Sequence, residues 1–84
     1  MNVKYNLEQK IIVFEVIEEL DHHNVEKIRR RADYEIQRNA PKRLTFDMKN
    51  VNFMDSSGIG MLIGRYKQLQ IFGGRIAVAG AKGK

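Results

Sequence analysis

The chain has 84 residues, which is enough for one domain with a single modest hydrophobic core. Fifteen Lys and Arg residues against ten Asp and Glu residues give a formal net charge of +5, and the lack of cysteine excludes disulfides, thiolate nucleophiles and cysteine zinc sites. The N-terminus lacks the apolar stretch of a signal peptide, and no apolar run approaches the roughly 20 residues of a membrane-spanning helix. We therefore expect one soluble, cytoplasmic domain over residues 1–84.

Hydrophobic periodicity predicts two strands and then a helix in the first half of the chain. Apolar and polar residues alternate over residues 2–7, as in a half-buried strand, and a turn follows at residues 8–9. Residues 11–17 are so rich in β-branched residues that we place them centrally in a sheet, and we expect this strand to end near Leu20. A helix then follows, with Asp21 or Asn24 as its N-cap and Asn39-Ala40-Pro41 as its end. Its apolar stripe is Val25, Ile28, Ala32 and Ile36.

The second half repeats the alternation of strand and helix. Residues 44–48 and 75–79 predict strands, and a helix between them ends at Gly73-Gly74, where a left-handed cap needs glycine. The apolar face of this helix is predicted to be Ile59, Leu62, Ile63, Tyr66 and Leu69. The resulting β-β-α-β-α-β order is typical of an α/β fold with a mixed sheet, in which the helices pack on the sheet.

Two polar loops follow strands of this predicted sheet. They are residues 20–24 (L-D-H-H-N) and residues 54–58 (M-D-S-S-G). Because the carboxyl ends of parallel strands meet at one edge of a sheet, we expect both loops to contribute to one surface. That surface would contain Asp21, His22, Asp55, Ser56 and Ser57.

The segment F-M-D-S-S-G-I-G-M-L-I-G (residues 53–64) leads from a strand into the second helix. Asp55 or Ser56 is a good N-cap, and we expect the backbone N–H groups after it, including those of Gly58 and Ile59, to lack intrahelical partners and to point outward. A phosphate on one of the serines would meet these groups and the positive end of the helix dipole, a contribution of roughly 0.3–1 kcal/mol. The alternative is a plain capping motif that only starts a helix.

Other readings of charged and polar residues are weaker. The basic run at residues 27–31 could bind nucleic acid, but acids lie four residues from its arginines, which is typical of a salt-bridged, solvent-facing helix. Gly60 and Gly64 allow close backbone approach, either for packing on the sheet or for a protein contact.

An enzymatic role is also the weaker alternative. Ser57 follows a strand and opens a helix, as a hydrolase nucleophile does, and His22 or His23 could serve as its base, but the G-x-S-x-G motif is absent. The paired histidines have no third ligand at metal spacing, and no phosphate-binding loop of the G-x-x-x-x-G-K-[ST] type is present. We therefore expect no catalytic activity, no metal and no cofactor.

The two loops together resemble the STAS domain of anti-sigma factor antagonists. The resemblance rests on E-L-D-H-H-N (residues 19–24) and F-M-D-S-S-G-I-G (residues 53–60), followed by G-R-Y-K-Q (residues 64–68) and F-G-G (residues 72–74). It implies a STAS-like mixed sheet over residues 3–79. In that family the second serine of D-S-S-G is phosphorylated by the partner kinase, which implicates Ser57, whereas spacing alone does not choose between Ser56 and Ser57.

The resemblance implies a bacterial regulator of transcription, of the kind that acts in sporulation. The unphosphorylated form would bind an anti-sigma factor that is also a serine kinase and thereby release the sigma factor; phosphorylation of Ser57 would switch it off, and a serine phosphatase would reset it. Neither a membrane nor nucleic acid is an expected direct partner. The predicted docking residues are Asp21, His22, Asp55, Ser56, Ser57, Gly58, Ile59 and Gly60.

Two features depart from the family pattern. Glu18 stands where family members commonly have glycine, and the family usually continues past the fourth strand with a helix, a strand and a final helix, whereas this chain stops at residue 84. We expect the shortened chain to self-associate or to be less stable than an extended one. The alternative functions are a structural STAS module of a stress-sensing assembly and a transporter-associated STAS domain.

Overall fold

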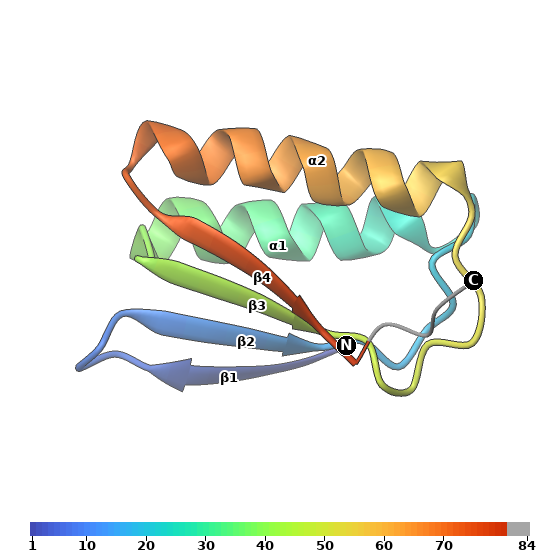
Figure 1. Cartoon of the computed structure of the whole chain (residues 1–84), viewed down its shortest axis with the longest axis horizontal. Coiled ribbons are helices and arrows are strands. Elements are labelled where there is room, and N and C mark those ends of the chain that lie inside the picture. The colour runs from blue at the N-terminus through green and yellow to red at the C-terminus, as the bar shows by residue number, and fades with distance from the viewer. Residues whose placement is uncertain (81–84) are drawn as a thin grey trace.

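Four strands and two helices follow one another in the predicted order in the computed structural model, which describes residues 1–80 (Figure 1). The elements are β1 (Asn2–Asn6), β2 (Ile11–Glu15), α1 (Val25–Asn39), β3 (Arg43–Asp47), α2 (Ser56–Ile71) and β4 (Arg75–Ala79). The β-β-α-β-α-β order is therefore confirmed. Strand β2 ends at Glu15, about five residues before its predicted end near Leu20.

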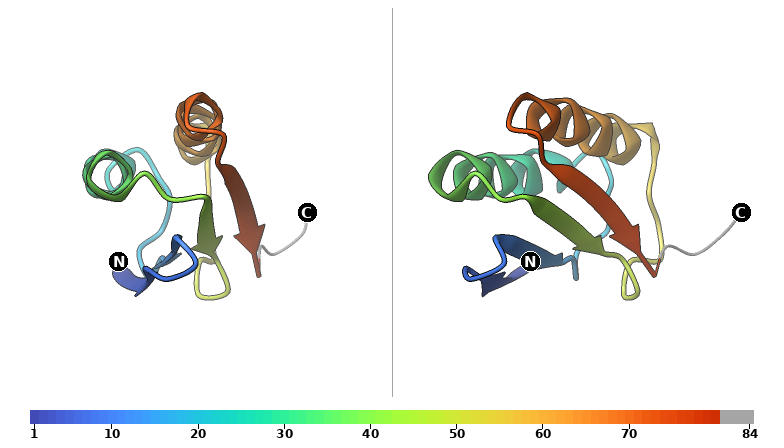
Figure 2. Two further views of the ribbon diagram at one scale, coloured as in Figure 1. Left: turned by 90° about the vertical axis from the view of Figure 1, so that its left-hand side faces the viewer. Right: turned by 60° about the vertical axis from the view of Figure 1, so that its left-hand side comes forward.

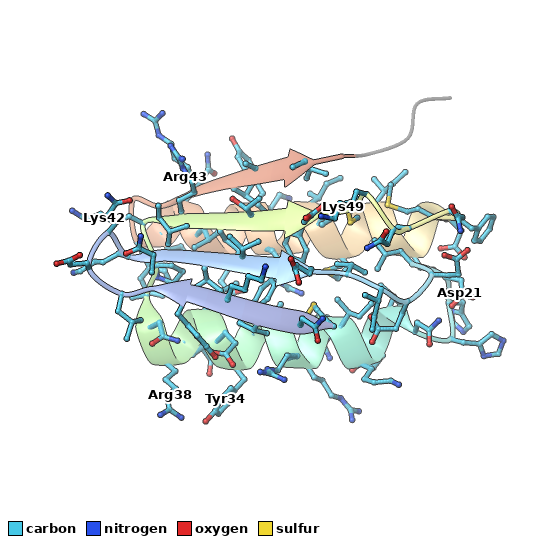
Figure 3. All side chains as sticks on the ribbon, turned by 90° about the horizontal axis from the view of Figure 1, so that it is seen from below. Asp21, Tyr34, Arg38, Lys42, Arg43 and Lys49 are labelled. Carbon is cyan, nitrogen blue, oxygen red and sulfur yellow. The ribbon has the colours of Figure 1, made fainter. Side chains whose placement is uncertain are left out.

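The sheet is mixed, with the strand order β1-β2-β3-β4. Strands β1 and β2 form an antiparallel hairpin, and β2-β3 and β3-β4 are parallel pairs, so β2 lies inside the sheet as predicted. Both helices lie on one face of the sheet (Figure 2). The opposite face is not covered by any helix of the described chain, and it faces the viewer in Figure 3.

The core lies between the two inner strands and the helices. Because successive strand residues point to opposite faces, every second residue of β2 and β3 is buried under the helices. Phe14 and Phe46 are directly opposite one another in the register, with ring centroids 5.3 Å apart. Each side chain of this size contributes about 1.5–3 kcal/mol when fully buried. The predicted stripe of α1 is confirmed, with Ile28, Ala32 and Ile36 all buried.

The predicted apolar face of α2 is wrong in part. Of its five members only Leu69 is fully buried, and Ile59, Ile63 and Tyr66 are each about half exposed. The reason is that α2 carries apolar residues on nearly every side, so periodicity does not identify the face that packs. The structure buries Met61 and turns Arg65 toward α1 instead.

Arg65 links the two helices through Asp33. Its Nε atom lies 3.1 Å from an Asp33 carboxylate oxygen, and the Arg65 side chain is largely shielded from solvent. Burial lowers the pKa of Arg65 from its usual value, and the charge of Asp33 opposes that shift. This contact between helices was not predicted, because it depends on how α1 and α2 lie side by side.

Glycines of α2 and of the turn after it have different roles. A Cβ atom at Gly60 or Gly64 would have no neighbour within 4 Å, so packing on the sheet, one of the two explanations given for these glycines, is wrong, and a protein contact stays a prediction. Gly73 has a φ of 74°, which confirms the left-handed residue after the helix. Gly74 is held close to the α1–β3 connection, because a Cβ there would lie 2.8 Å from the Pro41 carbonyl oxygen.

Ion pairs cover the surface of α1, as the sequence predicts. Arg29 pairs with Asp33 at 2.9 Å, Arg30 with Glu26 at 3.2 Å, and Arg31 with Glu35 at 3.0 Å. Glu35 departs from the predicted solvent-facing pattern because it is buried. Within residues 1–80, no helix has both the length and the apolar character needed to cross a membrane.

Candidate functional site

The two polar loops are joined by backbone hydrogen bonds. Leu20 and Met54 form an isolated parallel bridge, in which the Leu20 N–H donates to the Phe53 carbonyl at 3.0 Å and the Asp55 N–H donates to the Leu20 carbonyl at 3.1 Å. The loops lie at the carboxyl ends of β2 and β3, where both helices begin (Figure 1). The expected convergence is therefore confirmed, and Asp21 and Asp55 each follow one residue after the bridge.

Gly58 permits this junction. An added Cβ atom would lie 2.7 Å from the Met54 Cγ atom and 3.0 Å from both the Cβ and the carbonyl oxygen of Leu20. The first turn of α2 therefore packs directly against the bridge, with no space for a side chain at this position. The sequence marks Gly58 only as part of D-S-S-G, and the contact that requires glycine comes from a residue 38 positions earlier, Leu20.

Asp55 is the N-cap of α2, which resolves the alternative between Asp55 and Ser56. Its carboxylate accepts a hydrogen bond from the Ser57 N–H at 2.9 Å. Its carbonyl accepts from the N–H groups of Gly58 at 3.0 Å and Ile59 at 3.3 Å. The expectation that these two N–H groups are unpartnered and point outward is wrong, because Asp55 satisfies both of them.

A carboxylate therefore already occupies the positive end of the α2 dipole. An acidic N-cap is favourable there, since it accepts an N–H bond and offsets the partial positive charge of the helix end. Ser57 is half-buried beside this cap, and Ser56 is exposed. A further anion on Ser57 would thus add negative charge next to Asp55 instead of entering an empty anion site.

Asp21 organises the other loop. Its carboxylate accepts from the backbone N–H groups of His23 at 3.1 Å and Asn24 at 3.0 Å, which fixes the turn before α1. Asn24 occupies the N-cap position without a side-chain cap bond. The Asp21 side chain lies at the loop end of the molecule, far from the labelled Lys42 and Arg43 (Figure 3). Its local capping role is therefore established by geometry, while partner contact stays a prediction.

The histidines stand at the surface of the same loop. Both are exposed, and their rings are 6.2 Å apart in an edge arrangement. Among the described residues, neither imidazole hydrogen-bonds to Ser57, and no group of three His, Cys, Asp or Glu side chains could hold a metal ion.

Exposed apolar side chains complete the surface. Phe53, Met54 and Ile59 are all exposed beside the Leu20–Met54 bridge. The next helical residue, Gly60, has no side chain, and no atom lies within 4 Å of the position that its Cβ would take. Periodicity did not single out Phe53 and Met54, although two large apolar residues just after a strand are a usable signal of a contact surface. We call the surface made by Asp21, His22 and residues 55–60 the D-S-S-G edge.

A family model described as STAS domain matches residues 2–84. This chain belongs to the STAS domain family. It is 38% identical over 80 residues to an anti-sigma F factor antagonist of Paenibacillus polymyxa, covering 93% of this chain and 68% of that relative. A relative of the same name from Lysinibacillus sphaericus is 34% identical over 67 residues; the match covers 80% of this STAS domain and 57% of the relative.

Solved structures of a related protein share the fold. The structure of the anti-sigma factor antagonist SpoIIAA in its unphosphorylated form superimposes with a TM-score of 0.81 at 29% identity, covering 98% of this chain and 74% of that one. The structure of the Bacillus cell fate determinant SpoIIAA in the phosphorylated form gives a TM-score of 0.72 at 32% identity, over 89% of this chain and 67% of that one. These relatives are regulators, and this STAS domain shares their architecture.

Proposed function

We propose that this STAS domain is an anti-sigma factor antagonist that binds an anti-sigma factor through the D-S-S-G edge and so releases a sigma factor. The observation that carries the proposal is the Leu20–Met54 bridge, which unites the two motif loops into one surface. Relatives that bear the name anti-sigma F factor antagonist support the choice of partner.

Ser57 is the proposed site of regulation. The anti-sigma factor would also be a serine kinase that transfers the γ-phosphate of ATP to the Ser57 hydroxyl and leaves ADP, and a serine phosphatase would hydrolyse the phosphoserine again. The position of Ser57 supports this role, since it lies between the bridge and the exposed Ile59. The existence of a related protein in unphosphorylated and phosphorylated forms supports it as well.

The inhibitory effect follows from charge in a contact surface. A phosphoserine adds about −1.5 to −2 charges at neutral pH. Asp55 already holds the Ser57 N–H, and the N–H groups of Gly58 and Ile59 are already used, so the phosphate would find few free donors. Burying such a poorly paired charge on docking costs about 2–5 kcal/mol, which is a loss of tens- to thousands-fold in affinity. The switch requires no refolding.

The test is phosphorylation by a candidate anti-sigma F factor with ATP, with the modified residue located by mass spectrometry. Ser57→Ala should abolish incorporation, and Ser56→Ala is the matched control that should keep it. Labelled Ser57→Ala together with unlabelled Ser56→Ala would contradict the assignment. In a binding titration, authentic phosphoprotein should bind the anti-sigma factor far more weakly than the unmodified chain, and undiminished affinity would refute the switch.

A further inference from the structure

Four exposed cations gather at the end of the molecule opposite the D-S-S-G edge. They stand at the starts of three adjacent strands: Lys10 precedes β2, Lys42 precedes β3, and Arg43 and Arg75 are the first residues of β3 and β4. Backbone hydrogen bonds hold them together, because the N–H groups of Lys42 and Arg43 donate to the Lys10 carbonyl at 2.8 and 3.2 Å, and the Arg75 N–H donates to the Lys42 carbonyl at 2.8 Å. We call these four residues the basic end.

The basic end has a net positive charge, because the three turns at this end contain one acid, Glu8, against its four cations. Six Lys and Arg side chains elsewhere in the described chain are paired with acids, as Lys4 is with Glu15 at 2.8 Å, while Lys27, Arg38 and Lys67 are single exposed cations without a salt bridge. Among the described residues, no member of the basic end forms a salt bridge. Arg43 and Arg75 are directly opposite one another in the parallel register, where like charges repel. A bound anionic surface would remove this repulsion.

Large apolar side chains stand at the corners of the same end. Leu7, in the β1–β2 turn, is 66% exposed, and Ile71 and Phe72, at the end of α2, are 82% and 50% exposed. These two turns lie at the same end of the molecule, together with the α1–β3 connection (Figure 1). An open pocket of about 500 Å³ lies between them, lined by Gln9, Ile11, Lys42, Arg43, Phe72, Gly73 and Arg75.

This arrangement differs from that of a protein interface or a nucleic-acid site. Protein interfaces have an apolar core with charged residues depleted from it and a polar rim, whereas here three cations line the central pocket and the most exposed apolar side chains, Leu7 and Ile71, lie outside it. Phosphates of nucleic acid would neutralise the cations but give no role to exposed aliphatic corners such as Leu7 and Ile71. An anionic bilayer uses both features, because its headgroups attract the cations and its interface accepts the apolar side chains.

We propose, in contrast to the expectation from the sequence, that the basic end binds the surface of membranes that contain anionic phospholipid. Such peripheral contact needs no membrane-spanning helix. It places the D-S-S-G edge on the side facing away from the bilayer, since the two surfaces lie at opposite ends of the strands, as the labelled Asp21, Lys42 and Arg43 show (Figure 3). Membrane contact and partner docking are therefore compatible in one molecule.

The direct test is cosedimentation of the 84-residue chain with vesicles. Vesicles of phosphatidylcholine and phosphatidylglycerol in equal amounts should bind the chain, and vesicles of phosphatidylcholine alone should not. Binding should weaken steeply with salt, because the Debye length falls from about 10 Å at 0.1 M to about 3 Å at 1 M. Equal binding to both kinds of vesicle, or no binding to either, would overturn the proposal.

Charge-matched variants separate this surface from simple net charge. Arg43→Gln with Arg75→Gln should weaken partitioning to the anionic vesicles about 25-fold, at about fivefold for each cation removed near the surface. The control is Lys27→Gln with Lys49→Gln, which removes the same charge from exposed positions nearer the D-S-S-G edge, because Lys27 lies in the first turn of α1 and Lys49 follows the carboxyl end of β3. If the control loses as much binding as the test pair, net charge alone is responsible and the proposal fails.

Two further experiments test the exposed apolar side chains and the alternative partner, nucleic acid. Leu7→Ser with Ile71→Ser should reduce the fraction of protein bound to anionic vesicles at fixed salt. Far-ultraviolet circular dichroism checks that the variant is folded. Unchanged binding would contradict insertion of these two side chains into the membrane interface. A short DNA duplex serves as the second probe. If the chain binds the duplex and not the anionic vesicles, the basic end is a nucleic-acid surface and the membrane proposal is wrong.

Discussion

Replacing Gly58 with alanine tests whether the close contact between the first turn of α2 and the neighbouring loop builds the site. The new Cβ atom would lie 3.0 Å from both the Cβ and the carbonyl oxygen of Leu20, and 2.7 Å from the Met54 Cγ. The Met54 side chain is partly exposed and has room to move. Leu20 does not, because its N–H and its carbonyl are both held in the bridge.

The magnitude follows from two opposing effects. Overpacking a tight site costs about 1–3 kcal/mol, while alanine in place of glycine in a helix returns at most about 1 kcal/mol. We therefore expect Gly58→Ala to lower the free energy of unfolding by about 1–2 kcal/mol. Gly60→Ala is the matched control, since a Cβ there would meet no atom within 4 Å. It should stabilise the fold by about 0.5–1 kcal/mol.

Urea titration followed by circular dichroism measures both variants. In a domain of this size 1 kcal/mol shifts the melting temperature by about 4–8 °C, so thermal melts should separate the two proteins clearly. Gly58→Ala should also weaken anti-sigma factor binding, because any relief of the clash displaces the loop that carries Asp21. Equal stability of the two variants, or a more stable Gly58→Ala, would refute the reasoning that this contact joins the loops.

Three other changes test further parts of the structure. Asp21→Ala should cost about 1 kcal/mol in a urea titration, because two N–H groups lose their acceptor, whereas Asn24→Ala should cost less; equal losses would contradict this. Partial burial alone would raise the pKa of Glu18, but the hydrogen bond and charge of the N-terminal ammonium lower it below its ordinary 4.5. The stabilisation contributed by the Glu18 carboxylate is therefore complete above pH 4.5 and is lost as the pH falls through the lower pKa of the folded state. Glu18→Gln should then flatten the acid limb of a curve of unfolding free energy against pH. An unchanged slope would contradict this role of Glu18. Asp33→Asn should cost about 1–3 kcal/mol by removing the counter-charge of the largely shielded Arg65 and of Arg29, and Arg65→Met in that background should recover part of the loss; no recovery would show that Asp33 and Arg65 are not coupled.

Local periodicity in the sequence determined the elements and their order. The period of two in the strands and the stripe of Ile28, Ala32 and Ile36 in α1 identify the buried faces, because each of these elements has apolar residues along only one side. Parallel strand order is enough to place the loops after β2 and β3 at one edge. For this reason the motifs containing Asp21 and Ser57 could be assigned to one surface without coordinates.

Tertiary structure decided the features that depend on what lies opposite each residue. Helix α2 is apolar on several sides, so only its packing against α1 and the sheet selects Met61 and Leu69 over Ile59 and Ile63 as buried residues. The N–H groups of Gly58 and Ile59, which we expected to be free, donate hydrogen bonds to the Asp55 carbonyl, because the Asp55 backbone continues the helical hydrogen-bond pattern. The need for glycine at position 58 likewise arises from a close approach between segments distant in sequence, and no local pattern encodes the distance between them.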